Sequence, residues 1–285
     1  MYDVAIVGTG AAGVSAALTL KALNKNIIWF GSRQLSSKIR KAEQIRNYPG
    51  LPTVSGEQLQ SAFLAQIEEM GIEITDKNVT GVYNMGSYYG ILCGQEMFEA
   101  KAVIISTGTE TVKPLKGELE FVGKGVSYCA TCDGNLYKGK KIAVICTSKD
   151  FEEEIEYLAS LAEKVYLVAG YKDVSIKEDN VEMVSGRPIE ITGEKKASCL
   201  VFADKQIEID GIFMLKEAIT PSVLVSGIEM ADGHITVDRD CRTNMEGCFA
   251  AGDCTGRPYQ YAKAVGEGNV AAHSAAKYLS SQAKG

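Results

Sequence analysis

The residues best suited to chemistry are two cysteines separated by two residues, in the stretch CATCDG at 129–134. This spacing brings two sulfur atoms close enough to cycle between a dithiol and a disulfide. Asp133 follows the second cysteine, and a carboxyl group there can move a proton as the disulfide opens. We therefore expect Cys129, Cys132 and Asp133 to be the catalytic residues of a thiol–disulfide reaction.

The remaining cysteines do not favour a metal centre. They stand at positions 93, 146, 199, 241, 248 and 254. None of them forms a second CxxC, and the chain has only two histidines, whereas zinc and iron–sulfur sites need further ligands at short spacing. We predict no metal site and interpret these six residues as small apolar groups of the core.

A second chemical pattern is the glycine loop GTGAAG at 8–13. In a turn between a strand and a helix, Gly8 permits the tight bend and Gly10 lets the backbone approach a pyrophosphate. Gly13 lets the helix pack closely on the strand, and the helix N-terminus, including Ala11, offers N–H groups to the phosphates. The loop predicts a dinucleotide site.

The group that should hold the ribose in such a site is missing. An acidic residue is expected about 20 residues after the glycine loop, but no Asp or Glu stands between Asp3 and Glu43. We expect the ribose to be held by the backbone or by Ser32.

The elements that must position these groups form two similar patterns of strand, helix and strand. The first has strands expected at 2–7 and 26–30 around a helix at 14–23, and the second has strands at 141–145 and 165–169 around a helix at 151–163. Further strands are expected at 102–106 and 248–251, and a last helix at 257–280. This order predicts an α/β fold with two Rossmann-like, three-layer ββα nucleotide-binding domains.

Composition excludes several classes of function. The formal net charge of −6 argues against nucleic acid as a partner. No apolar run is long enough to span a membrane, and the N-terminus has no basic region ahead of an apolar one, so we expect neither a membrane span nor a signal peptide. Eight cysteines in such a chain indicate reduced or redox-active thiols, and we expect a cytoplasmic protein.

Five motifs together resemble those of the low-molecular-weight thioredoxin reductases. They are GTGAAG at 8–13, NYPG at 47–50, STG at 106–108, CATCDG at 129–134 and AAGD at 250–253. The resemblance implies FAD, a homodimer, thioredoxin as partner, and an FAD-binding domain made of residues 1–111 and 216–285. A smaller NADPH-type domain, residues 112–215, would be inserted between these parts and carry the CxxC.

The same resemblance implies roles for individual residues. Cys132 is expected to face the flavin and Cys129 to attack the disulfide of the partner, with Asp133 as general acid. Near the cofactor, Gly252 and Asp253 are expected at the ribityl and phosphate region and Asn47 near the isoalloxazine. The other expected cofactor contacts in or beside the motifs are Thr107, Gly108, Tyr261 and Ala262.

Two departures from the family lie near the expected flavin. The RQA that opens the last helix of the family reads Gln260-Tyr261-Ala262, and Tyr261 could either stack on the flavin ring or pack at the start of the helix. The family's run GGQLTTTT reads SSKIRKAE at 36–43, which could bring Lys38 close to the flavin and favour its anionic reduced form.

The inserted domain departs further. The family's second glycine motif is replaced by CTSKDF at 146–151, and the carboxylates of Asp150 and of residues 152–154 crowd the start of the helix, where they would repel a pyrophosphate. Asp150 is expected to cap this helix. The HRR cluster that binds the 2′-phosphate of NADPH is replaced by AGY at 169–171. We therefore expect a degenerate domain that binds no NADPH.

A chain without NADPH needs another electron donor, and the resemblance is strongest to flavin thioredoxin reductases that use ferredoxin. Residues 31–46 carry five basic residues against Glu43, a net charge of +4 that suits an acidic ferredoxin. Three alternatives stay open: an FAD-dependent dithiol oxidase using oxygen, an NADPH-dependent thioredoxin reductase with an atypical site, and a flavin-binding module without catalysis. In the oxidases the CxxC tends to be followed by His, so Asp133 favours the reductase.

Overall fold

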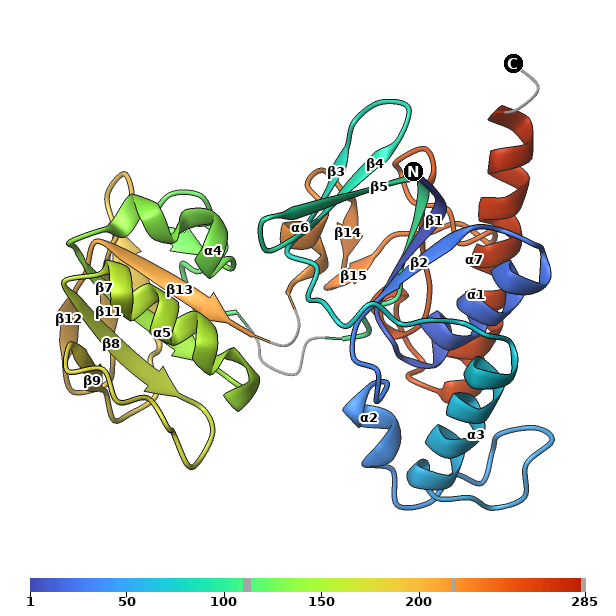
Figure 1. Ribbon diagram of the computed structural model, residues 1–285, viewed down its shortest axis with the longest axis horizontal. Coiled ribbons are helices and arrows are strands. Elements are labelled where there is room, and N and C mark those ends of the chain that lie inside the picture. The colour runs from blue at the N-terminus through green and yellow to red at the C-terminus, as the bar shows by residue number, and fades with distance from the viewer. Residues whose placement is uncertain (110–113, 217–218, 283–285) are drawn as a thin grey trace. The chain divides into compact units, whose positions relative to one another are not determined.

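The computed structural model describes residues 1–109, 114–216 and 219–282. The chain divides into two compact units, which Figure 1 shows: unit 1 is formed by Met1–Thr109 and Leu224–Gly285, and unit 2 by Glu110–Val223. Unit 2 is thus inserted in the sequence between the two parts of unit 1. Each unit contains a parallel sheet with helices, which confirms the predicted α/β fold.

Unit 1 is built on a six-stranded sheet in which β5 is central. The strands run in the order β2-β1-β5-β4-β3, and β16 also pairs with β5. Their bounds are Tyr2–Val7 (β1), Ile27–Phe30 (β2), Gly81–Asn84 (β3), Tyr89–Cys93 (β4), Glu96–Ile105 (β5) and Cys248–Ala250 (β16). The end of β5 pairs in parallel with β1 and β16, whereas its beginning pairs antiparallel with β4. A short hairpin of β14 (Met230–Ala231) and β15 (His234–Ile235) follows unit 2 in the sequence.

The helices of unit 1 are α1 (Ala11–Ala22), α2 (Ser37–Arg40), α3 (Gly56–Glu69) and α7 (Tyr261–Gln282), and α6 (Pro221–Leu224) lies at the unit boundary in the sequence. In unit 1, α1 and α7 pack on the parallel part of this sheet, α3 packs on α1, and α2 packs on α3. α1 and α7 lie side by side, as Figure 1 shows, because both present small residues: a Cβ at Gly268 would stand 2.2 Å from the Ala12 carbonyl oxygen. None of the described helices combines the length and apolar character that a membrane span requires.

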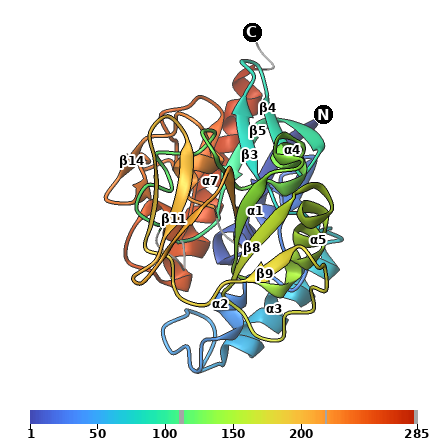
Figure 2. The same ribbon diagram turned by 90° about the vertical axis from the view of Figure 1, so that its left-hand side faces the viewer.

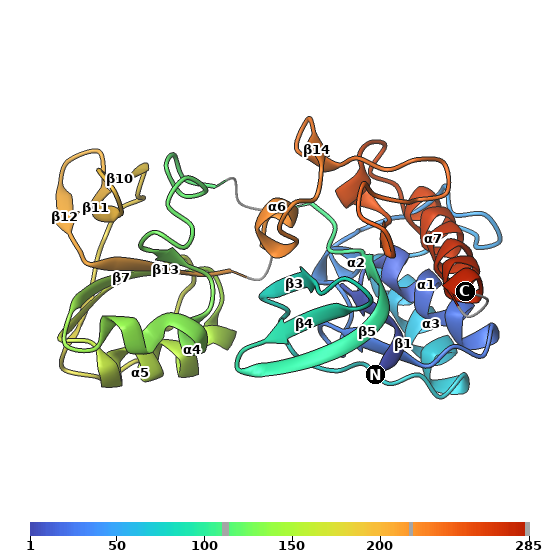
Figure 3. The same ribbon diagram turned by 90° about the horizontal axis from the view of Figure 1, so that it is seen from above.

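Unit 2 has three layers, which can be followed in Figure 3. The middle layer is a parallel sheet in the order β6-β13-β7-β8-β9. The strands of this sheet are Val126–Ser127 (β6), Lys141–Cys146 (β7), Lys164–Ala169 (β8), Val181–Met183 (β9) and Gly211–Leu215 (β13). One face carries α4 (Ala130–Asp133), the 3₁₀ turns Gly134–Tyr137 and Lys149–Phe151, and α5 (Glu152–Leu161), which Figure 2 shows beside β8. The other face carries an antiparallel sheet of β10 (Glu190–Gly193), β11 (Ala197–Val201) and β12 (Gln206–Glu208).

Alternation of apolar residues along β7 explains the layers of unit 2. Ile142, Val144 and Cys146 are buried in the core beneath α5, whereas Ala143 belongs to the core shared with β10 and β11. Successive side chains of a strand point to opposite faces, and a strand covered on both faces reads as a continuous apolar run. The run KIAVIC is therefore buried on both sides.

The contact of α1 with α7 gives a stability prediction for two glycines of one helix. Gly268→Ala should lower the free energy of unfolding by about 1–3 kcal/mol, because its Cβ would overlap the Ala12 carbonyl oxygen. Gly266→Ala is the matched control: no atom lies within 4 Å of its Cβ position, so helix propensity should raise stability by up to ~1 kcal/mol. Urea denaturation followed by circular dichroism measures both, and equal effects would contradict the packing argument.

Candidate active site

The residues expected to contact a cofactor gather at one edge of unit 1. They follow the carboxyl ends of the four parallel strands: Gly8 follows β1, Ser32 follows β2, Thr107 and Gly108 follow β5, and Gly252 and Asp253 follow β16. The carboxyl ends of parallel strands form the edge at which α/β folds bind ligands. The fold therefore brings together residues that stand up to 245 positions apart in the sequence.

The glycine loop has the geometry that a dinucleotide site needs. Gly8 has a φ of +110°, and a Cβ there would stand 2.4 Å from the Ser106 carbonyl oxygen. A Cβ at Gly13 would stand 2.1 Å from the Gly8 carbonyl oxygen, so the helix lies directly against the turn. At Gly10, in contrast, the nearest atom to the Cβ position is 4.0 Å away. Gly8 and Gly13 thus serve the fold, whereas Gly10 leaves room for an outside group.

The polar groups at this edge of the sheet fit the pyrophosphate and ribose of FAD. Gly10 is the N-cap of α1 and has no side chain that could accept the N–H groups of the first turn, which begins at Ala11 and contains no acidic residue. The hydroxyl oxygen of Thr107 is buried and has no hydrogen-bond partner among the described residues. Ser32 is exposed, and its hydroxyl oxygen accepts the Gln34 N–H at 3.2 Å. These donors and acceptors can hold a dinucleotide at this edge.

Lys38 connects three parts of this edge. Its ammonium donates to the carbonyl oxygen of Thr109 at 2.6 Å and to the Thr109 hydroxyl at 3.0 Å, and its own carbonyl accepts the Tyr261 hydroxyl at 3.2 Å. Burial lowers the pKa of Lys38, and the charge of Asp253 partly opposes this. Burial likewise raises the pKa of Asp253, and the positive charges of Lys38 and Lys263 partly oppose this rise. Tyr261, expected either to stack or to pack, is half-buried and ties the start of α7 to α2.

Two residues near this edge were not expected from the sequence. Lys263 donates to the carbonyl oxygens of Gly252 and Gly256 at 2.8 and 2.7 Å and pairs with Glu267 at 3.1 Å. Glu267 accepts the Gly252 N–H at 2.8 Å, so the pair holds the loop that carries Asp253. Their i, i+4 spacing on a helix was the available signal.

Asn47 and Ala262 lie beside the same helix start. The Asn47 amide donates to the Gln260 side-chain oxygen at 2.6 Å, which connects the NYPG motif to α7. Ala262 is exposed in the first turn of α7 and has no polar side-chain atom, so it can contact a cofactor only by packing or through its backbone.

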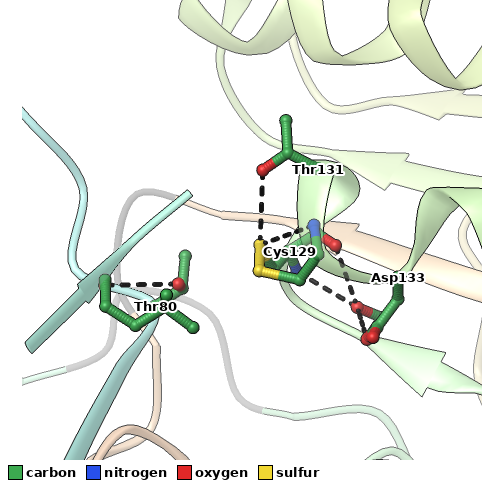
Figure 4. The surroundings of a disulfide bond; sticks show 7 residues. Thr80, Cys129, Thr131 and Asp133 are labelled. Atoms are coloured by element: carbon green, nitrogen blue, oxygen red, sulfur yellow. Dashed lines mark hydrogen bonds between the residues drawn. A yellow bond between two sulfur atoms is a disulfide. The ribbon is translucent and has the colours of Figure 1, made fainter. Parts of the chain in front are cut away.

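The redox cysteines of unit 2 form a disulfide at the start of a short helix. Cys129 and Cys132 have Cα atoms 5.3 Å apart, and Cys129 is the N-cap of α4, where its sulfur accepts the Cys132 N–H at 3.2 Å. Cys129 is 9% exposed, whereas Cys132 is exposed. The Thr131 hydroxyl lies 3.6 Å from the Cys129 sulfur, and Figure 4 shows Thr131 and Asp133 on different sides of Cys129.

Ser127 connects Asp133 to the backbone of Cys129. Its buried hydroxyl donates to the Asp133 carboxylate at 2.6 Å and accepts the Cys129 N–H at 3.1 Å. The hydroxyl therefore orients a carboxyl group that can exchange a proton with the cysteine pair. Ser127 was not predicted from the sequence, because no local pattern connects it to Asp133, six residues further on.

The turn after β7, where a nucleotide fold would bind phosphate, is closed by its own side chains. Asp150 does not cap the helix as expected, because the N-cap of α5 is Phe151, which makes no side-chain cap hydrogen bond. The preceding 3₁₀ turn is capped by Ser148, whose oxygen accepts the Asp150 N–H at 3.4 Å. Serine is as good a cap as aspartate and stands at the position from which it reaches this N–H. Phe151 is 6% exposed and fills the contact between the helix and the sheet. The Cys146 thiol donates to the Ser148 carbonyl at 3.1 Å.

The start of α5 already holds a carboxylate. Glu152 accepts hydrogen bonds from the Ser175 N–H at 3.0 Å, from the Ser175 hydroxyl and from the Tyr171 hydroxyl at 3.1 Å. The hydrogen bonds from Ser175 lower the pKa of Glu152, so this group is anionic at neutral pH. The loop that would bind a 2′-phosphate in the thioredoxin reductases thus binds a carboxylate of its own unit.

Residues 2–268 match the family model of the pyridine nucleotide-disulphide oxidoreductases, and the chain belongs to this family. It is a disulfide oxidoreductase, and the proteins of this family to which it is similar are FAD-binding flavoproteins. Among the described residues, no three His, Cys, Asp or Glu side chains are grouped so that they could hold a metal ion.

Similar proteins confirm the resemblance to thioredoxin reductases. Two crystal structures of a ferredoxin-flavin thioredoxin reductase from Clostridium acetobutylicum are 46% and 47% identical, with TM-scores of 0.89 and 0.92; they cover 100% and 98% of this chain and 99% and 98% of their own. A thioredoxin reductase from Gloeobacter violaceus is 26% identical, with a TM-score of 0.79, over 99% of this chain and 95% of its own. The thioredoxin reductase of Listeria monocytogenes is 29% identical over 98% of this chain and 94% of its own.

Burial predicts that five of the six cysteines outside the CxxC are inert. It raises the pKa of Cys146 to about 11 and the pKa values of Cys93, Cys241, Cys248 and Cys254 to about 12. At pH 8 at most about one such thiol in a thousand is a thiolate, the form that reacts. Iodoacetamide at pH 8 should therefore label Cys129 and Cys132 after reduction by dithiothreitol and leave these five unlabelled, as mass spectrometry of peptides measures. Labelling of the five in folded protein would contradict this.

The hydrogen bond of Ser127 gives a prediction for catalysis. Ser127→Ala should slow disulfide reduction about ten-fold, because losing an orienting hydrogen bond costs about 1.4 kcal/mol in the transition state. Ser127→Thr keeps a hydroxyl and should restore most of the rate. Ser160→Ala is the control, since it removes an exposed hydroxyl that donates to Tyr157 in the same unit. Single-turnover rates of disulfide reduction measure the effect. A Ser127→Thr variant that is slow despite a normal melting temperature would contradict the orienting role of the hydroxyl.

Proposed function

We propose that this protein is a flavin-dependent thioredoxin reductase that takes electrons from reduced ferredoxin and passes them through FAD and the Cys129–Cys132 pair to the disulfide of thioredoxin. Unit 1 is the FAD-binding domain, and unit 2 is a degenerate NADPH-type domain that carries the redox cysteines. FAD, when bound, accepts electrons singly and delivers them in pairs, which matches a one-electron donor to a two-electron disulfide.

The observation that carries this proposal is the carboxylate of Glu152 at the start of α5. It accepts three hydrogen bonds from the loop after β8, two from Ser175 and one from Tyr171. A helix start stabilises one anionic group through its N–H groups and dipole, and a second anion there is repelled. The carboxylate of Glu152 at the helix start would repel the pyrophosphate of NADPH, and a 2′-phosphate would have to compete with it for the donors of Ser175 and Tyr171. We infer that another donor supplies the electrons.

Ferredoxin fits this role in energy and in charge. The similar protein from Clostridium acetobutylicum is a ferredoxin-flavin thioredoxin reductase. Plant-type ferredoxins have potentials near about −400 mV and thioredoxin near about −270 mV, so two electrons release roughly 6 kcal/mol. Arg33, Arg40, Lys41 and Arg46 are all exposed in unit 1 and offer an acidic protein a basic surface.

In the proposed reaction Cys129 attacks the disulfide of thioredoxin, Cys132 faces the flavin, and Asp133 is the general acid. Cys129 is 9% exposed, so it must become accessible before it can attack a protein disulfide. Enzymes commonly provide such access by a movement of loops or domains. The hydrogen bond from Ser127 keeps Asp133 beside the cysteine backbone during this step.

The resemblance to thioredoxin reductases also leads us to propose a homodimer. The six thiols outside the CxxC are all unpaired by disulfides, which fits a reducing compartment, and we propose that the protein acts in the cytoplasm. Light scattering of the holoenzyme measures the mass of the assembly directly.

Reduction of the flavin by reduced ferredoxin, followed by stopped-flow absorbance, tests the proposed donor. Arg40→Glu/Lys41→Glu should slow this reaction about ten-fold at low ionic strength, and the difference should shrink as salt is added, because exposed charges are screened. Lys195→Glu/Lys196→Glu is the matched control, since it reverses two adjacent exposed charges in unit 2.

Two outcomes would overturn the proposed function, and a third would overturn the proposed docking surface. If NADPH bleaches the flavin anaerobically as fast as ferredoxin does, the nucleotide site is functional. Oxygen uptake with small dithiols, without reduction of thioredoxin, would identify a dithiol oxidase instead. Rates that do not change with ionic strength, in wild type and in both double variants, would remove the basic surface as the docking site.

A further inference from the structure

A buried cluster of charged and polar side chains in unit 2 has no part in the chemistry described above. The Lys216 ammonium lies 2.6 Å from one carboxylate oxygen of Glu118, and the Tyr128 hydroxyl donates to the same oxygen. The other Glu118 oxygen accepts the Leu115 N–H at 2.8 Å. Among residues 1–109, 114–216 and 219–282, Glu118 and Lys216 are the only charged residues that are buried, with side chains 0% and 5% exposed.

Stability alone does not explain this ion pair. Transfer of two charges from water into a protein interior is unfavourable, and an apolar pair of similar volume is often as stable or more stable. Buried charge pairs are instead useful where one arrangement of the backbone must be specified, since each partner is satisfied only in that arrangement. The location of the pair shows which backbone it specifies.

The cluster joins three segments that meet at the redox helix. Lys216 directly follows β13, whose Phe213 pairs with Ser127 of β6. Tyr128 lies between β6 and Cys129, and its ring is 5.9 Å from the Lys216 Nζ. Glu118 comes from the segment before β6 and contacts both. The residue that precedes the first redox cysteine is therefore held by two buried charges from separate segments.

We propose that Glu118, Lys216 and Tyr128 are positioning residues that keep the backbone of Cys129 at the distance from Cys132 that disulfide formation requires. The Cα atoms of the two cysteines are 5.3 Å apart. A backbone fixed at this distance raises the effective concentration of one thiol at the other, because the entropy that is lost when the two thiols come together has already been lost when the chain folds. The cluster thus favours the disulfide over the dithiol.

Equilibrium with glutathione measures this effective concentration. Two thiols of the protein lose two electrons and two protons to glutathione disulfide, the Cys129–Cys132 bond forms, and two molecules of glutathione are released. For Tyr128→Phe and for the double variant Glu118→Gln/Lys216→Met, we expect an equilibrium constant about ten-fold smaller than in wild type, which corresponds to a midpoint potential about 30 mV higher. Alkylation and mass spectrometry of the holoenzyme quantify the two redox forms.

Unit 2 contains a matched control on its surface. Lys164 pairs with Glu182 at 2.6 Å and lies 5.0 Å from the ring of Tyr166, but both charged side chains are partly exposed and the trio lies on β8 and β9. Tyr166→Phe and Glu182→Gln/Lys164→Met should leave the glutathione equilibrium unchanged.

Two results would overturn the proposal. One is a Tyr128→Phe variant that keeps the circular dichroism spectrum and flavin content of the wild type and also has its equilibrium constant. This variant removes one hydroxyl and keeps the ion pair, so it tests the proposal even if the double variant does not fold. The other is an equal shift in the control variants. The titration involves neither ferredoxin nor thioredoxin, so failure of the proposed function leaves it interpretable.

Discussion

The turn after the first strand holds β1, β5 and α1 closer together than any side chain would allow. A Cβ at Gly8 or Gly13 would overlap backbone oxygens at 2.4 and 2.1 Å. The Ser106 hydroxyl donates to the Val7 and Gly8 carbonyls at 2.9 and 3.1 Å, and the Trp29 indole also donates to Gly8 at 2.8 Å. Because these contacts fix the carboxyl ends of neighbouring strands, the loops that follow them meet at one edge, where a dinucleotide can lie across the start of a helix.

Unit 2 has the same arrangement of strand, turn and helix, but its edge has the opposite chemistry. Unit 1 offers a helix start without acidic residues in its first turn, whereas α5 begins with three glutamates. One of them, Glu152, takes the hydrogen bonds of the neighbouring loop, and Phe151 occupies the space that a small residue would leave. A fold of this kind therefore binds a nucleotide only when a few residues at the turn keep the backbone accessible and the local charge positive.

The sequence predicted those parts of the site whose chemistry lies within a few neighbouring residues. The glycine loop, the CxxC and the α/β fold are of this kind, because glycine spacing and strand periodicity are local signals. Contacts between distant residues form only once the sheets have formed, so no local pattern predicts them. Examples are Asn47 with Gln260, 213 residues apart, and Glu118 with Lys216, 98 residues apart. The last helix begins at Tyr261 rather than at 257, since Pro258 disfavours a helical conformation in the residue before it.

Unit 2 keeps a five-stranded parallel sheet although the turn after β7 is filled by its own side chains, and the pairing of the strands gives a physical reason. The first redox cysteine, Cys129, stands two residues after β6, which pairs with β13, and β13 in turn pairs with β7. Loss of β7 or α5 would expose the apolar residues of β13 and release the segment that positions Cys129. Residues 148–151 of the turn that follows β7, in contrast, take no part in the pairing of β7 with β13 and β8. The side chains of this turn can therefore differ without loss of the strand pairing, whereas the strands on either side of it are needed for the position of Cys129.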